Sequence, residues 1–169
     1  ASPASSIKYA GISPELGLSE TQQTLVLNSL RGQVKLQVDG QIKTGRDIVI
    51  MAMLGAEEFG FATSALIVLG CVMMRKCHMN TCPVGVATQD AELRKRFLGR
   101  SEYLVNFFTF LAEEVREHLA EMGFTKLDDI VGRTDLINRK SENKTEKHAL
   151  LDFSKVLFRI NNDAALRHI

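Results

Sequence analysis

The sequence predicts an α/β fold in which short parallel strands alternate with helices. Within the first 75 residues, two short segments alternate apolar and polar residues as strands do, and segments of helical periodicity flank them. The chain has 169 residues, of which 45% are hydrophobic and 24% charged, which is enough apolar content for one globular domain. Because parallel neighbours need a crossover connection, the alternation favours a parallel pair with a helix between its strands.

The first elements follow from turn and capping residues. Residues 1–18 carry Pro, Gly and small polar residues, and we expect them to be mostly loop. Ser19 and Gln22 fit a capping box, and the helix that they begin should end at Gly32. The elements expected next are a strand at 34–40, a helix at 44–55 capped by Thr44, a strand at 57–63 and a buried apolar helix at 64–77.

The second half of the sequence is predicted to be mainly helical. A helix capped by Ser101 should run to residue 122, because its apolar residues form one stripe and Gly123 follows it. The other expectations are an irregular segment at 77–89, a short helix at 90–97 capped by Asp90, a short helix at 125–133, an exposed linker at 138–148, and a strand or extended arm at 151–160.

Charge and composition argue against several classes of partner. The formal net charge is +1, so nothing favours binding to nucleic acid or to an anionic membrane surface. No apolar run reaches the ~18 residues that a membrane span needs. The first residues show neither Met nor a signal peptide, and we expect the chain to be part of a larger polypeptide.

Three cysteines within twelve residues are the strongest chemical signal. Cys71, Cys77 and Cys82 lie in one segment, and Pro83 follows the last of them, as in ferredoxin-like runs. An odd, clustered set does not suit a secreted disulfide framework and favours a reducing, cytoplasmic setting with an iron–sulfur cluster. Two alternatives stay open: a zinc site that uses the cysteines with His78, and cysteines that are inert free thiols or disulfide-bonded.

The ends of the two predicted strands are candidate anion sites. Small residues follow both strands, and glycine lets backbone N–H groups approach a phosphate, such as that of flavin mononucleotide (FMN). The alternative is that these glycines only make tight turns. The candidate residues are Asp39, Gly40 and Gln41 after the first strand, and Gly60, Phe61, Ala62 and Thr63 after the second.

Several stretches of the sequence resemble the large chain of glutamate synthase. They are SPASSIKYAG, DGQIKTGRDIVIMAMLGAEEFGFAT, CVMMRKCHMNTCPVGVATQD, FFTFLAEEVREHLAEMGF and GRTDLI. The resemblance as a whole extends over nearly all of residues 1–137. The resemblance implies the C-terminal part of a (β/α)8 barrel, with its last two strands and their helices, followed by an iron–sulfur loop and C-terminal helices. The domains expected from it are 1–75 (barrel part), 71–89 (iron–sulfur loop), 90–137 (helical extension) and 138–169 (linker and arm).

The resemblance also implies cofactors, substrates and partners. The family makes L-glutamate from 2-oxoglutarate and glutamine-derived ammonia, and electrons pass through a 3Fe–4S cluster to FMN. The cluster ligands of the family fall on Cys71, Cys77 and Cys82, and its flavin-phosphate loops fall on the two strand ends, at Gly40–Gln41 and Gly60–Thr63. A Gly is common in the family where Gln41 stands. The electron donor would be a partner subunit that oxidises NAD(P)H, or ferredoxin.

A complete barrel needs about 250 residues, so the resemblance also implies missing parts. Alone, the chain should not catalyse the full reaction, and its unpaired strand edges should make it associate with the remainder of the large chain or with itself. The alternative functions are a zinc-stabilised interaction module and a metal-free module whose long helix at 101–122 is a docking surface.

Overall fold

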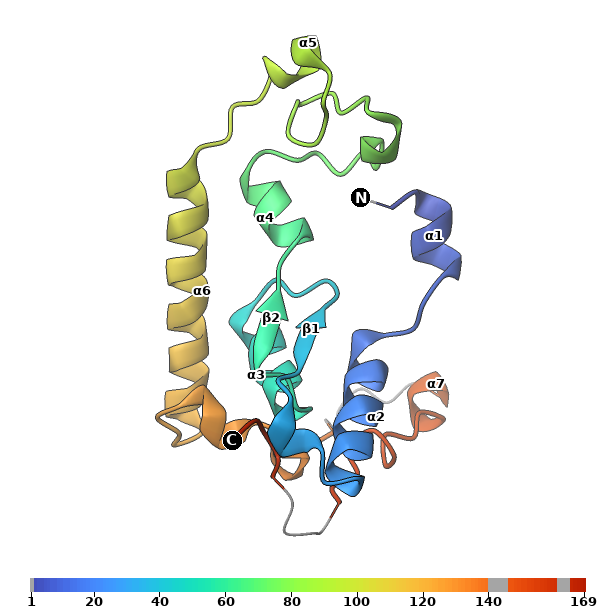
Figure 1. Cartoon of the computed structure of the whole chain (residues 1–169), viewed down its shortest axis with the longest axis vertical. Coiled ribbons are helices and arrows are strands. Elements are labelled where there is room, and N and C mark those ends of the chain that lie inside the picture. Colours follow the sequence, from blue (N-terminus) through green and yellow to red (C-terminus); the bar gives the residue numbers. More distant parts are fainter. Residues whose placement is uncertain (1, 140–145, 161–164) are drawn as a thin grey trace.

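The structure is a computed structural model that describes residues 2–139, 146–160 and 165–169. Figure 1 shows its helices and its two strands. The helices are α1 (Ala4–Tyr9), α2 (Pro14–Leu27), α3 (Gly45–Met53), α4 (Thr63–Val68), α5 (Ala91–Arg94), α6 (Ser101–Glu121) and α7 (Glu146–Ala149). The strands are β1 (Gln37–Asp39) and β2 (Glu58–Gly60), and the 3₁₀ turns are η1 (Arg31–Gln33), η2 (Cys77–Met79), η3 (Leu127–Ile130) and η4 (Thr134–Leu136).

The two strands are parallel, as predicted, and α3 is the crossover between them. They pair in the register Gln37 with Glu58, Val38 with Phe59, and Asp39 with Gly60. Both are shorter than predicted, because within the described chain each has only one neighbouring strand. Their carboxyl ends therefore lie side by side at one edge of the sheet, which is where parallel α/β folds place their ligands.

Helix α3 is the centre of the hydrophobic core. Its start confirms the predicted cap: the Thr44 hydroxyl accepts from the N–H of Asp47, and the Asp47 carboxylate accepts from the N–H of Thr44. One face of α3 packs with Val38 of β1, and the other packs with Leu119 of α6. The buried side chains of α3 are Ile48, Val49, Met51, Ala52 and Met53.

The N-terminal expectation was wrong. Residues 1–18 are not mostly loop, because α1 occupies Ala4–Tyr9 and α2 begins at Pro14 rather than at Ser19. Proline suits the first turn of a helix, where its missing N–H has no partner to lose. Ser19 is instead buried inside α2, and its hydroxyl donates to the carbonyl of Val156.

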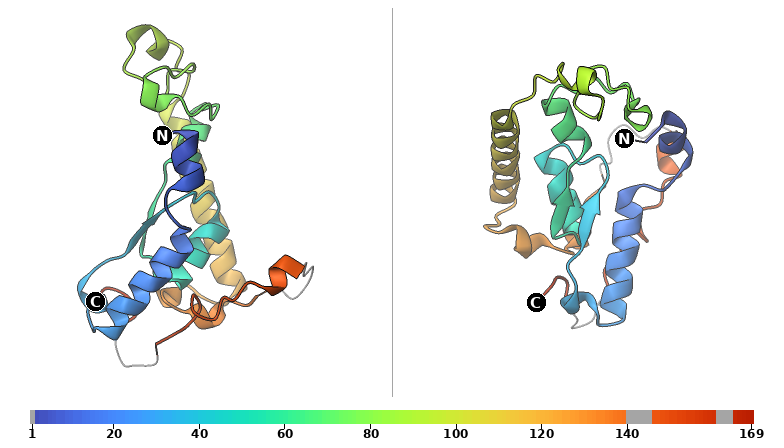
Figure 2. Two further views of the ribbon diagram at one scale, coloured as in Figure 1. Left: turned by 90° about the vertical axis from the view of Figure 1, so that its right-hand side faces the viewer. Right: turned by 45° about the horizontal axis from the view of Figure 1, so that its top comes forward.

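Helix α6 runs alongside α3 and α4, as both views in Figure 2 show. Its length agrees with the prediction, although Arg100 rather than Ser101 occupies the N-cap position. Gly123 ends it in the left-handed conformation, with a φ of 80°, as expected of a C-terminal glycine. Of the predicted apolar stripe, Leu111 and Leu119 are buried.

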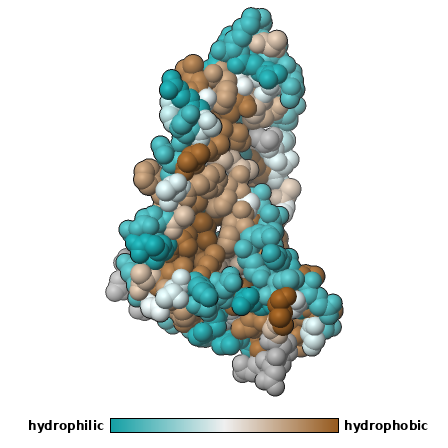
Figure 3. All heavy atoms as spheres, turned by 60° about the vertical axis from the view of Figure 1, so that its left-hand side comes forward, coloured by the Kyte–Doolittle hydropathy of each residue, from teal (hydrophilic) through white to brown (hydrophobic). Residues whose placement is uncertain are grey.

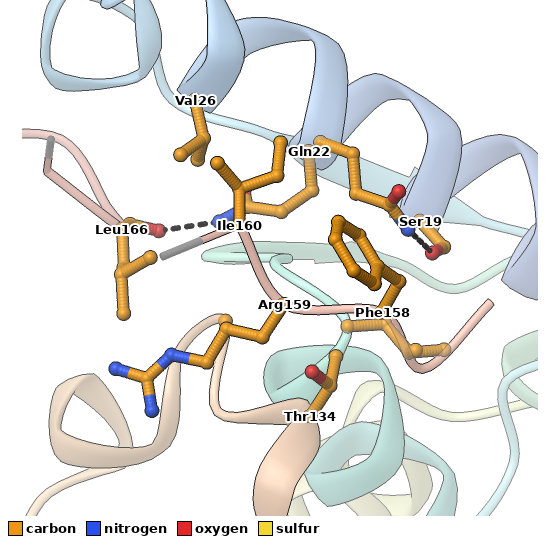
Figure 4. A pocket seen from close by; sticks show the side chains of 11 residues that line it. Ser19, Gln22, Val26, Thr134, Phe158, Arg159, Ile160 and Leu166 are labelled. Carbon is orange, nitrogen blue, oxygen red and sulfur yellow. Dashed lines mark hydrogen bonds between the residues drawn. The ribbon is translucent and has the colours of Figure 1, made fainter. Parts of the chain in front are cut away.

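The C-terminal segment forms an extended arm, and its described residues contain no strand. Three side chains of α2 hold it through its backbone: Ser19, Gln23 and Gln22 donate to the carbonyls of Val156, Lys155 and Leu166. A small pocket lies between α2, the arm and η4 (Figure 4). The linker expected at 138–148 lies mostly outside the described residues. None of the described helices combines the length and hydropathy that a bilayer span requires.

Candidate functional site

The loops after β1 and β2 lie next to each other. Asp39 and Gly60 are register partners, and a Cβ added to Gly60 would lie 3.0 Å from the side chain of Asp39. The hydroxyl of Ser64, buried at the start of α4, donates to the carbonyl of Ile42 at 3.2 Å. The structure thus brings together the predicted site residues of the first loop (residues 39–41) and of the second loop (residues 60–63).

The first loop turns through two residues of positive φ. Gly40 has a φ of 146° and Gln41 a φ of 63°. Gly40 also approaches Pro14 closely, because an added Cβ would lie 2.9 Å from its ring. The cavity beside this loop is lined by the carboxylates of Glu15 and Asp47. Burial opposes the ionisation of Asp47, but hydrogen bonds from the N–H groups of Lys43 and Thr44 lower its pKa, so the cavity carries negative charge.

The second loop is supported from α6. Phe61 packs edge to face on Phe108, with ring centroids 5.2 Å apart and an interplanar angle of 79°. Ala62 is the N-cap residue of α4, and Thr63 is the first residue of that helix. The acidic cavity beside the first loop includes none of residues 60–63 in its lining.

The predicted buried helix at 64–77 was wrong in both length and burial. Helix α4 ends at Val68, because Gly70 adopts a φ of 95°. The N–H groups of Gly70 and Cys71 donate to the carbonyls of Ile67 and Leu66, which is the Schellman arrangement. Only Ser64 of α4 is buried. Gly70 is the residue in the sequence that indicates this helix end. Because apolar residues flank Gly70 on both sides, the segment resembled one continuous helix.

All three cysteines line one small pocket beyond this stop. The pocket also includes the backbone segment between Cys71 and Cys77 and the residues that follow Cys82. Met73 and Arg75 adopt positive φ values of 57° and 54°, which makes the segment turn back on itself. The N–H of Met73 donates to the sulfur of Cys71 at 3.4 Å. The cysteine segment (residues 71–89) therefore gathers the three cysteines around one pocket.

Cys82 is the most buried of the three, with 4% of its surface exposed. Burial opposes the ionisation of its thiol, but hydrogen bonds from the backbone N–H groups of Ala87, Val84, Val86 and Gly85 lower its pKa below the ordinary value. Thiolates are the form that binds metals. The loop after Cys82 is thus arranged to stabilise a sulfur anion.

Sequence reasoning missed two supports of the cysteine segment. Asn80, with a φ of 59°, accepts through its side-chain oxygen from the hydroxyl of Thr88 and the N–H of Gln89, which closes the segment. Gly85 lies directly under the backbone of α5, at Leu93, and leaves no room for a side chain. Asn and Gly in a turn-rich stretch were signals of positive φ, but nothing local predicted the contact with α5.

The geometry does not favour a single-ion site. Within the described ranges, no three His, Cys, Asp or Glu side chains come together closely enough to hold one metal ion. His78 is exposed and lies outside the residues that line the cysteine pocket. Ligands of one tetrahedral zinc lie about 3.8 Å apart, because each Zn–S bond is about 2.3 Å long. A polynuclear cluster accepts wider spacing, since each cysteine binds a different iron.

Two parallel strands with a crossover helix, followed by a three-cysteine pocket, define this chain as part of an α/β protein with a candidate metal-cluster segment. The conserved region of glutamate synthase matches residues 1–125. The chain therefore belongs to the glutamate synthase family, and the resemblance read from its sequence is confirmed.

Individual relatives come from several branches of this family. The chain is 55% identical to the NADPH glutamate synthase large chain of Bacillus subtilis (strain 168) over 159 residues, which are 94% of this chain and 10% of the relative. It is 61% identical to that of Azospirillum brasilense over 83% of this chain and 9% of the relative. It is 55% identical to the chloroplastic ferredoxin-dependent glutamate synthase 2 of Arabidopsis thaliana over 93% of this chain and 10% of the relative. The chain spans about a tenth of the length of these relatives.

Proposed function

We propose that this chain supplies the iron–sulfur ligands and part of the FMN site of a glutamate synthase. The observation that carries the proposal is the pocket shared by Cys71, Cys77 and Cys82, in which backbone N–H donors lower the pKa of the Cys82 thiol. The whole enzyme would make L-glutamate from 2-oxoglutarate and glutamine-derived ammonia, with electrons supplied by an NAD(P)H-oxidising subunit or by ferredoxin. When bound, the 3Fe–4S cluster would supply one-electron transfer to the flavin.

The distribution of charge separates the roles of the two strand-end loops. The carboxylates beside the first loop would repel a phosphate, so we place the FMN phosphate at the backbone of Gly60, Phe61, Ala62 and Thr63. Asp39, Gly40 and Gln41 would then border the flavin rather than its phosphate. Helix α4 starts at the second loop and ends three residues before Cys71, so one short element would connect the flavin to the cluster.

The remaining parts of the proposal concern the setting of the chain. Residues 1–75 would complete a (β/α)8 barrel with the remainder of the large chain, followed by the cluster loop (71–89), the helical extension (90–137) and the linker with its arm (138–169). Clustered reduced thiols favour the cytoplasm. The isolated chain would be inactive, because its relatives are about ten times longer.

Iron analysis of anaerobically reconstituted protein tests the proposal. The parent chain should bind iron and sulfide and absorb broadly in the visible range. Each of the variants Cys71→Ser, Cys77→Ser and Cys82→Ser should lose most of the bound iron and most of the visible absorption. Met79→Leu is the matched control, because Met79 lies in the same segment with 54% of its surface exposed, outside the pocket lining, and should leave iron binding unchanged. Equal iron in the parent and in all three serine variants would refute the proposal.

The same preparation distinguishes the two alternatives. Zinc in place of iron, lost in a His78→Ala variant, would favour the zinc-stabilised module. If the parent bound no metal, the remaining alternative would be the metal-free module that uses α6 as a docking surface.

A further inference from the structure

We propose that Phe108 of α6 is a positioning residue that holds the second loop in the shape that binds the FMN phosphate. This inference rests on the proposed function, since it concerns how that site is held. Helix α6 lies outside the strand–helix alternation that forms the site. It would therefore act on flavin binding from the helical extension, through one ring contact with Phe61.

The contact is well defined geometrically. The rings of Phe61 and Phe108 meet at 79° with centroids 5.2 Å apart, which is the favoured edge-to-face arrangement. Phe107 meets Phe108 in the same manner, at 5.2 Å and 69°, and Phe107 packs against the core that contains Leu111. Three rings thus connect the loop to the buried side of α6.

Helix α6 is itself anchored close to this contact. The carboxylate of Glu114 accepts from the N–H of Gly45 at the start of α3, at 2.8 Å. The backbones approach so closely there that a Cβ on Gly45 would lie 2.8 Å from the N atom of Val115. Leu111, one turn beyond Phe108, is buried with 6% exposed. Phe108 therefore offers the loop a fixed surface.

Besides Phe108, the side chain of Phe61 packs against the edge of the core that contains Leu111, and the backbone of the second loop has few supports of its own. Strand β2 pairs on one edge only, within the described chain, and the N-cap of α4 lacks a side-chain hydrogen bond. The hydrogen bond from Ser64 to the carbonyl of Ile42 holds the start of α4 and does not involve Phe61. Loss of the Phe108 ring would remove one of the two surfaces that hold Phe61 and would loosen the backbone N–H groups around it.

A comparison of FMN with riboflavin isolates this effect. The full-length enzyme would be stripped of flavin and titrated with each ligand by fluorescence quenching. Phe108→Ala should weaken FMN binding about threefold to tenfold, because an aromatic pair contributes that range of affinity. Riboflavin binding should change little, since riboflavin lacks the phosphate that the loop holds. A variant that had lost its fold would lose affinity for both ligands.

Two further variants control the interpretation. Phe110→Ala removes a ring from the same helix that is 71% exposed and should leave both affinities unchanged. Phe108→Tyr should restore FMN affinity, whereas Phe108→Leu should not, because only the former keeps the ring edge. Equal FMN affinity of parent and Phe108→Ala would overturn the inference while leaving the proposed function intact. A parent that binds no FMN would instead count against the proposed function.

Discussion

Gln41 shows how a single backbone angle affects stability in this site. Its φ of 63° lies in the left-handed region, which costs a residue with a Cβ roughly 1–2 kcal/mol. Gln41→Gly should therefore raise the free energy of unfolding by about 0.5–1 kcal/mol, after the greater freedom of glycine in the unfolded chain is counted. Urea unfolding of the chain would measure the change.

The matched control for this prediction is Gln37→Gly in β1. Gln37 is exposed and lies in a strand, where glycine only weakens the structure. This variant should lose stability while Gln41→Gly gains it. Loss of stability in both variants would show that the angle at Gln41 carries no strain.

At the scale of elements, the contact between α3 and α6 depends on a glycine. Gly45→Ala would place a Cβ 2.8 Å from the N atom of Val115, and backbone cannot yield as a flexible side chain does. We expect a loss of about 1–3 kcal/mol in the free energy of unfolding, as for other overpacked contacts. A thermal melt would record it as a lower midpoint.

Gly17→Ala is the corresponding control within α2. An added Cβ at Gly17 meets nothing within 4 Å. Because alanine favours the helix more than glycine does, this variant should raise the free energy of unfolding by about 1 kcal/mol. If Gly45→Ala lowers the free energy of unfolding while Gly17→Ala raises it, the cost comes from the close approach of α3 and α6. If Gly45→Ala melted at the parent temperature, α3 and α6 would have to lie farther apart.

The sequence predicted elements well where the determining residues are neighbours. The box of Thr44 and Asp47, the cap of Asp90 and the stop at Gly123 are all local and were confirmed. The helix at 64–77 was wrong, because apolar residues on both sides of Gly70 resembled one continuous helix. Contacts between distant residues, such as Phe61 with Phe108, leave no local pattern in a single sequence.

The candidate site was predictable in part for the same reason. Parallel pairing follows from the alternation of elements, and it places the two strand-end loops together. The spacing of the cysteines indicated a cluster but could not show that Asn80 closes the segment or that Gly85 lies under α5. Those supports depend on backbone angles and on packing between separate segments.

At the scale of the whole molecule, Arg31 connects four parts of the chain. Its fully buried guanidinium donates to Gln22 of α2, to the carbonyls of Val34 and Gly55, and to the carboxylate of Glu57 at 2.6 Å. Glu57 also accepts from the N–H of His168 in the arm. One ion pair therefore joins α2, the approaches to both strands and the C-terminal arm.

This ion pair predicts how stability depends on pH. Partial burial opposes the ionisation of Glu57, but the hydrogen bond from Arg31 and the N–H of His168 lower its pKa below the ordinary value of 4.5. A lowered pKa contributes stability that is present above pH 4.5 and is lost as the pH falls through the pKa of the folded state. Glu57→Gln should be less stable than the parent at neutral pH, by about 1.5–3 kcal/mol, because the amide can still accept from Arg31 but no longer carries the opposite charge.

The difference between parent and variant should shrink in acid, and urea unfolding at several pH values would measure it. Asp47 and Asp135 also have lowered pKa values and remain in both proteins, so the difference isolates Glu57. A difference that stayed constant down to acid pH would show that Glu57 is not ionised in the folded chain.

The surface of the molecule agrees with a place inside a larger protein. An apolar band runs down the face shown in Figure 3. Several large apolar side chains are exposed, among them Val105 at 63%, Phe110 at 71% and Leu98 at 85%. Contiguous exposed apolar surface marks a contact site. We therefore retain the proposal that the chain packs against the remainder of the large chain, or self-associates without it.

The stop at Gly70 has a consequence for how this region can change in length. Each residue added to an α-helix rotates the next part of the chain by about 100° and advances it by about 1.5 Å. A single insertion in α4 would therefore swing Cys71 to another side of the helix axis, away from Cys77 and Cys82. Substitutions on the exposed faces of α4 would leave that direction unchanged, so the number of residues in α4 is constrained more tightly than their identity.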